Sequence, residues 1–163
     1  MPREQSSVQI FNRQKTRRLD LALLRRIGRE LLANHFPKGG QLGVHFVDAV
    51  EMAQVNEQFL GHHGSTDVIT FNYEEGESPG VLNGELFICV DDAVACAPRF
   101  RTTWQSELVR YVVHGVLHLR GFDDRRAIAR REMKREENKQ LKELSRRFDF
   151  GKVERVKNAA RRK

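Results

Sequence analysis

The segment HGVLHLRGFDD, residues 114–124, constrains this chain more than any other, because it combines two histidines, a glycine turn and a carboxylate. Residues four apart on a helix share one face, so the imidazoles of His114 and His118 can reach one ion. Gly121 can adopt the left-handed conformation that ends helices, and the chain can then turn Asp124 back toward that ion. Three protein ligands and one open position are the pattern of a catalytic zinc site, so we expect one Zn²⁺ per chain.

Other interpretations of these residues remain open at this stage. Two histidines at helical spacing also occur as buried residues that are hydrogen-bonded to the backbone. Asp123 can serve as the carboxylate, or it can cap the next helix. Gly115 occupies the place of the general base in the peptidase motif HExxH, which argues against a small metallopeptidase. A set of two histidines and one carboxylate also suits ferrous iron, so another divalent metal is an alternative to zinc.

Length, charge and hydropathy define the class of protein. A chain of 163 residues suits one domain with a single core. It has neither a signal-peptide core nor the run of about 20 apolar residues that spans a bilayer, so we expect a cytoplasmic protein without a membrane partner. The net charge of +7 favours polyanionic partners. We predict a domain over residues 1–150 and a basic, flexible tail over residues 151–163.

The hydrophobic periodicity predicts an α+β fold, with helices packed on a single mixed or mostly antiparallel sheet of about four strands and the HGVLH helix at its centre. The N-cap of this central helix is Thr102 or Thr103. Alternating or continuous apolar runs mark the expected strands, which are 8–11, 42–47, 68–73 and 84–92. Apolar residues every three or four positions mark the expected helices 20–36, 49–60 and a helix running from about 104 to 120. A short helix is expected over residues 93–101, and the charged segment 125–147 is expected to form a solvated helix with Glu and Lys/Arg pairs at helical spacing.

Three motifs together resemble the YbeY family of ribosomal RNA maturation factors. They are TDVITF (residues 66–71), GEL (residues 84–86) and HGVLHLRGFDD, and they are similar to the family's motifs in order and spacing across about residues 44–144. The resemblance implies a zinc-dependent, single-strand-specific endoribonuclease that acts in maturation of small-subunit (16S) ribosomal RNA and in ribosome quality control. It also implies single-stranded RNA, the small subunit and ribosomal proteins as partners.

The chain departs from the family pattern at two positions. Asp124 replaces the family's third metal histidine, and aspartate is a competent zinc ligand. Leu60 falls where the family usually has a basic residue that can clamp a phosphate. Arg120, Arg99 and Arg101 are the candidate RNA-binding substitutes, with the loop imidazoles of His62 and His63 as a further possibility, although these two equally suit a solvated loop.

The resemblance therefore suggests His114, His118 and Asp124 as metal ligands, with His114 also in a catalytic role. Glu85 and Thr66 are further catalytic candidates beside Asp67, each with a structural role at a strand end as the alternative. A second function stays open. The chain would then be a ribosome-assembly module whose metal is structural and whose nuclease activity is small.

Overall fold

One mixed sheet of four strands organises the computed structural model, which describes residues 6–73 and 80–156. The strand order is β1-β2-β4-β3, with β1, β2 and β4 parallel and β3 antiparallel to β4. The strands are β1 (Ser7–Asn12), β2 (Gly40–Val47), β3 (Val68–Asn72) and β4 (Leu82–Cys89). The predicted α+β class and the single mixed sheet are confirmed.

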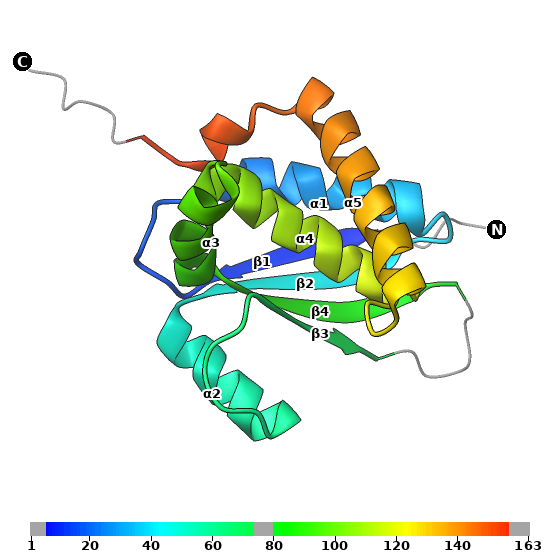
Figure 1. The fold of residues 1–163 in the computed structure, drawn as a ribbon. Coiled ribbons are helices and arrows are strands. Elements are labelled where there is room, and N and C mark those ends of the chain that lie inside the picture. The colour runs from blue at the N-terminus through cyan, green and yellow to red at the C-terminus, as the bar shows by residue number, and fades with distance from the viewer. Residues whose placement is uncertain (1–5, 74–79, 157–163) are drawn as a thin grey trace, which may run out of the picture.

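The helices cover the two faces of the sheet unequally. The α-helices are α1 (Leu21–His35), α2 (Ala49–Leu60), α3 (Val90–Cys96), α4 (Trp104–Arg120) and α5 (Ala127–Arg147). Of these, α1, α3, α4 and α5 lie on one side of the sheet and α2 on the other (Figure 1). Two short 3₁₀ helices, η1 (Ala97–Phe100) and η2 (Phe150–Val153), follow α3 and α5. No helix of the described segments is both long and apolar enough to cross a membrane.

Local signals explain where the helices begin and end. The side chains of Asp20, Asp48 and Thr103 each accept a hydrogen bond from a backbone N–H in the first turn of α1, α2 and α4. Gly61 and Gly121 adopt positive φ angles and end α2 and α4. The glycine turn that was expected after the second histidine is therefore in place.

The strand predicted over residues 84–92 is wrong at its end. β4 stops at Cys89, and α3 begins at Val90. Asp91 explains the difference, because its carboxylate accepts hydrogen bonds from the Ala49 backbone N–H, at 2.7 Å, and from the Thr16 hydroxyl. Asp91 and Asp92 also lie in the first turn of α3, where carboxylates interact favourably with the helix dipole.

The first residues assigned to the flexible tail pack on the domain. Val153 is fully buried in the main core, and Glu154 forms a β-bridge with Leu19. The Asp20 N–H donates to the Val153 carbonyl at 2.8 Å, and the Arg155 N–H donates to the Arg18 carbonyl at 2.9 Å. An apolar valine after the glycine of η2 is the sequence signal for this contact. Residues 157–163 of the predicted tail lie outside the described residues.

The helix α4 packs directly against β4 at a glycine. A Cβ atom on Gly115 would lie 2.7 Å from Leu86 Cδ2, and Leu86 is fully buried. The side chain at this position therefore faces the sheet, whereas His114 and His118 lie on another face of the helix.

We expect Gly115→Val to destabilise the fold by about 1–3 kcal/mol, because the extra carbons overpack a closed core. Gly115→Ala should cost less, since alanine gains about 1 kcal/mol of helix propensity that offsets part of the clash. Urea unfolding of both variants measures these changes. A valine variant as stable as the wild type would show that Leu86 can repack freely.

Candidate metal centre

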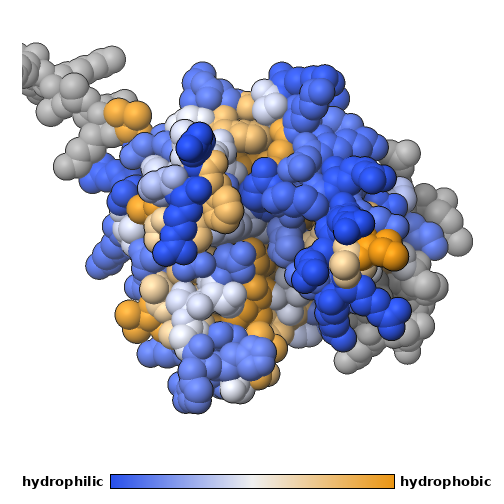
Figure 2. Space-filling view, viewed as in Figure 1, coloured by the Kyte–Doolittle hydropathy of each residue, from blue (hydrophilic) through white to orange (hydrophobic). Residues whose placement is uncertain are grey.

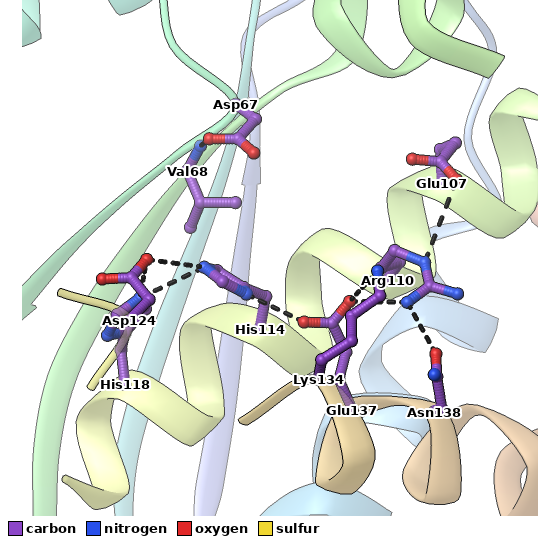
Figure 3. A network of polar contacts seen from close by, with 10 residues as sticks. All are labelled: Asp67, Val68, Glu107, Arg110, His114, His118, Asp124, Lys134, Glu137 and Asn138. Carbon is purple, nitrogen blue, oxygen red and sulfur yellow. Dashed lines mark hydrogen bonds and ion pairs between the residues drawn. The ribbon is translucent and has the colours of Figure 1, made fainter. Parts of the chain in front are cut away.

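Three side chains converge at the C-terminal end of α4 and the loop that follows it. His118 Nε2 lies 3.1 Å from His114 Nε2 and 3.4 Å from Asp124 Oδ2, and the third distance, from His114 Nε2 to Asp124 Oδ2, is 3.9 Å. One ligand atom from each residue thus lies within 4.8 Å of the other two. The helical spacing brings the two imidazoles edge to face, with ring centroids 4.7 Å apart, and the turn at Gly121 brings the carboxylate back (Figure 3).

These distances suit a tetrahedral metal site. Zinc bonds to imidazole nitrogen and carboxylate oxygen are about 2.0–2.2 Å long, so the ligand atoms of a regular tetrahedron lie about 3.3–3.6 Å apart. The three observed separations bracket that range. Two histidines and one carboxylate leave a fourth position for water or substrate.

A buried carboxylate fixes the orientation of His114. Glu137 Oε2, on α5, lies 2.9 Å from His114 Nδ1, and only 6% of the Glu137 side chain is exposed. The other oxygen of Glu137 accepts a hydrogen bond of 2.6 Å from Arg110 Nη1, which also donates to Asn138 (Figure 3). With Nδ1 held in this way, Nε2 of His114 points to the cluster, as in many sites where a carboxylate orients a metal-binding histidine.

Charge and burial shift the pKa values of this pair in opposite directions. Burial by itself lowers the pKa of His114, but the hydrogen bond and charge of Glu137, with the charges of Asp67 and Asp124, raise it above its ordinary value. Burial by itself raises the pKa of Glu137, but its bonds to His114 and Arg110 lower it below the ordinary value. Glu137 is therefore a carboxylate at neutral pH, able to stabilise a positive charge on His114 or on a metal beyond it.

Two of the three cluster residues, His114 and Asp124, line a cleft of about 840 Å³ between α3–η1, α4 and α5. Its floor is acidic, with Asp67, Asp92 and Glu107, whereas the α5 wall is basic. The basic residues of that wall are Arg130, Arg131 and Lys134. Figure 2 shows the α5 side of this surface as mostly hydrophilic, interrupted by a small apolar patch. Burial raises the pKa of Asp92, and the nearby charges of Asp67 and Asp91 raise it further.

The structure brings some of the predicted catalytic residues to the cleft and separates others from it. Asp67 lines the cleft beside His114, and its carboxylate accepts a hydrogen bond of 2.8 Å from the Val68 N–H (Figure 3). The same carboxylate accepts a hydrogen bond of 3.3 Å from the Thr66 hydroxyl. Thr66 therefore supports Asp67 and does not line the cleft. Asp123 accepts a hydrogen bond from the Arg125 N–H at 3.0 Å and lies outside the cluster. It does not cap α5, whose N-cap is Arg126 and whose first turn receives no side-chain capping hydrogen bond within the described residues.

Glu85 lies on the opposite face of the sheet from the cluster. Its neighbours on β4, Gly84 and Leu86, face α4, so Glu85 points the other way. Its two oxygens lie 3.0 Å from His45 Nε2 and 2.9 Å from the Tyr73 hydroxyl. The alternation of side chains along β4, which the continuous apolar run concealed, thus separates Glu85 from the cluster.

We expect Glu85→Gln to preserve RNA cleavage and to change the acid stability. Burial by itself raises the pKa of Glu85, but its hydrogen bonds to His45 and Tyr73 lower it below the ordinary value of 4.5. A carboxylate with a lowered pKa stabilises the fold above pH 4.5, and this contribution disappears as the pH falls through the folded-state pKa. Thermal unfolding from pH 7 to pH 3 should show the wild type losing its advantage over the variant in that acidic range. An advantage that grows toward low pH would contradict this assignment.

The predicted RNA-binding arginines occupy two different settings. Arg120 donates a hydrogen bond of 2.8 Å to His35 Nδ1 at the end of α4, away from the lining of the cleft. Arg99 and Arg101 are exposed on either side of Phe100, which does line it. Leu60 lies at the C-terminal end of α2, with the exposed His62 and His63 following in the loop.

Sequence reasoning missed Glu137, Arg110 and the basic wall of the cleft. The segment 125–147 was interpreted chiefly as a solvated, charge-paired helix. A signal was nevertheless present, because the buried positions of α5 recur every three or four residues and include two polar ones. They are Met133, Glu137, Gln140 and Leu144. A glutamate on the buried face of a helix requires a partner, which here is the histidine–arginine pair.

Known proteins share both the sequence pattern and the fold. The sequence profile of the family described as endoribonuclease YbeY matches residues 9–145. Endoribonuclease YbeY of Chlorobium phaeovibrioides is 33% identical over 138 residues, which is 85% of this chain and 90% of that protein. Its counterpart in Chlorobaculum tepidum is 34% identical over 84% of this chain and 97% of its own length. The solution structure of TM1509 from Thermotoga maritima is similar with a TM-score of 0.63, at 25% identity, over 94% of this chain and 99% of that one.

Proposed function

Because the chain belongs to the YbeY endoribonuclease family, we propose that it is a zinc-dependent, single-strand-specific endoribonuclease that acts in small-subunit (16S) ribosomal RNA maturation and ribosome quality control. The observation that carries this proposal is the position of the His114, His118 and Asp124 cluster at one end of a cleft with a basic wall. A polyanion approaching that wall would present its phosphates beside an open metal position. A cytoplasmic location and ribosomal partners accompany this role.

Each group in the cleft has a role in the proposed reaction. A divalent ion bound by the three residues would polarise a phosphoryl oxygen and lower the pKa of a water molecule at the open position. Glu137 holds His114 in the orientation that binds the ion, and Arg110 keeps Glu137 ionised. Asp67, the carboxylate of the floor that lies beside His114, is the group we propose as proton acceptor.

The proposal is tested with short RNAs that differ only in pairing. Purified protein reconstituted with zinc should cleave an internal linkage of a single-stranded segment of small-subunit RNA and leave the matched duplex intact. A chelator should abolish cleavage, and zinc should restore it in preference to Mg²⁺ or Fe²⁺. Protein that binds small-subunit particles equally with and without metal and cleaves nothing would contradict the enzymatic proposal and favour the assembly module.

The geometry of α4 disfavours a peptidase. In HExxH enzymes the residue after the first histidine is the general base, and here that position is Gly115. A side chain at this position would press on Leu86 in the core and would not enter the cleft. We expect no cleavage of casein by the zinc-loaded protein.

A further inference from the structure

The cleft continues beyond the histidines toward the start of α4. Glu107 precedes His114 by seven residues, or two helical turns, so the two lie about 10 Å apart along the helix axis. Phe100 and Thr102 line the same cleft together with Glu107. This end of the cleft contains none of the proposed metal ligands, and its features require a separate explanation.

Phe100 presents an uncovered aromatic ring to the cleft. Its relative exposure is 68%, and within the described segments it makes no contact with another aromatic ring or a cation. The next residue, Arg101, has a φ of 53° and closes the turn that carries the ring. An exposed aromatic ring is stabilised when another flat, apolar group stacks on it. In single-stranded RNA the unpaired bases can stack on such a ring.

Glu107 is a nearly buried acceptor that lacks a donor. Only 7% of its side chain is exposed, and the nearest cationic atom, Arg110 Nε, lies 3.9 Å away. Among the described residues, none donates a hydrogen bond to its carboxylate within normal geometry. Burial raises the pKa of Glu107, although Arg110 and Lys134 oppose that shift. A ligand N–H group that reached this carboxylate would relieve the cost of burying it.

The opposite wall supplies charge of the sign that a nucleic acid needs. Arg130, Arg131 and Lys134 line the cleft from α5. A backbone phosphate can lie against these cations while its base points inward, because the acidic floor repels the phosphate and attracts amino groups. Among the pyrimidines, cytosine carries an exocyclic amino donor, whereas uracil carries a carbonyl at that position.

We propose that this end of the cleft is a subsite for one unpaired, amino-bearing base of the RNA, stacked on Phe100 and hydrogen-bonded to Glu107. The inference rests on the proposed function and deepens it, because it names which feature of the substrate the site selects. A base in a duplex has its faces stacked and its pairing edge occupied, so it cannot enter. The subsite thereby gives the enzyme a preference for single strands and for cytosine over uracil.

The test compares two labelled phosphorothioate hexamers, oligo(C) and oligo(U), which resist cleavage, on the zinc-loaded protein by fluorescence anisotropy. The wild type should bind oligo(C) about 10-fold more tightly than oligo(U), as expected for one hydrogen bond to a charged group. Phe100→Ala should weaken the binding of both oligomers about 10-fold through lost stacking, and Phe100→Trp should retain it. Glu107→Gln should bring the two affinities together, because an amide can also donate to uracil.

Matched controls separate the subsite from general effects. Phe59 is an exposed phenylalanine on α2, beyond the other face of the sheet, so Phe59→Ala should bind like the wild type. Metal content and melting temperature are measured for every variant. If Phe100→Ala bound both oligomers as tightly as the wild type, the proposal of a base-stacking subsite would be wrong. If Glu107→Gln still bound oligo(C) about 10-fold more tightly than oligo(U), the proposed hydrogen bond between the base and Glu107 would be wrong. A wild type that binds with the expected pattern but cleaves no unmodified RNA would contradict the proposed function alone.

Discussion

Replacing His118 with alanine should abolish metal binding and RNA cleavage together. The variant loses one of three protein ligands, and the two that remain, His114 Nε2 and Asp124 Oδ2, lie 3.9 Å apart. Loss of an outer partner of a metal ligand costs about 10–100-fold in metal affinity or activity, so loss of a ligand itself should cost on the order of 100-fold or more. Elemental analysis of dialysed protein and cleavage of single-stranded RNA measure the two effects.

The matched control for His118 is His63→Ala. His63 is an exposed histidine in the loop after α2, and its removal should leave one metal ion per chain and full cleavage. Circular dichroism of both variants should match that of the wild type, because His118 lies at the edge of the core. Equal metal content in wild type and His118→Ala would show that the ion, if any, binds elsewhere.

Replacing Glu137 should have the second largest effect. Whether the variant loses mainly stability or mainly metal affinity should depend on the residue that replaces it. Glu137→Ala leaves the Arg110 guanidinium and the His114 Nδ1 without their buried partner, so we expect about 3–5 kcal/mol of destabilisation. Glu137→Gln keeps the shape and one acceptor oxygen, so it should fold and lose about 10–100-fold in metal affinity.

Zinc titration against a chelating indicator gives the affinity of Glu137→Gln, and urea unfolding gives the stability of Glu137→Ala. Glu132→Ala is the control on the same helix, because Glu132 is exposed and should change neither quantity. A Glu137→Gln protein with wild-type affinity would mean that His114 needs no outer partner to bind the ion.

Some parts of the site could be predicted from local sequence because they depend on local geometry. The histidine pair follows from the spacing of residues on one helix, and the return of Asp124 follows from the left-handed turn at Gly121. The capping residues of α2 and α4 are equally local. The family resemblance added the reaction, which spacing alone leaves open.

Other parts depend on contacts between distant segments. Glu137 reaches His114 only because α5 folds back along α4, and no spacing rule covers their separation of 23 positions in the sequence. Glu85 was misplaced because the run GELFICV is apolar enough to suggest burial on both faces, whereas its odd-numbered positions face the side that α2 covers only in part. The cleft itself arises between three helices, so its basic wall became visible only when the helices were placed.

The bridge between Leu19 and Glu154 bears on how the chain is completed during synthesis. Residues 18–20, which lead into the first helix, are hydrogen-bonded to residues 153–155, which follow the last long helix. A ribosome adds about 5–20 residues per second, and N-terminal segments begin to fold first. The start of α1 must therefore wait until residues 153–155 have emerged before its last backbone partners arrive. The formation of these backbone hydrogen bonds between residues 18–20 and residues 153–155 is therefore expected to be a late step of folding.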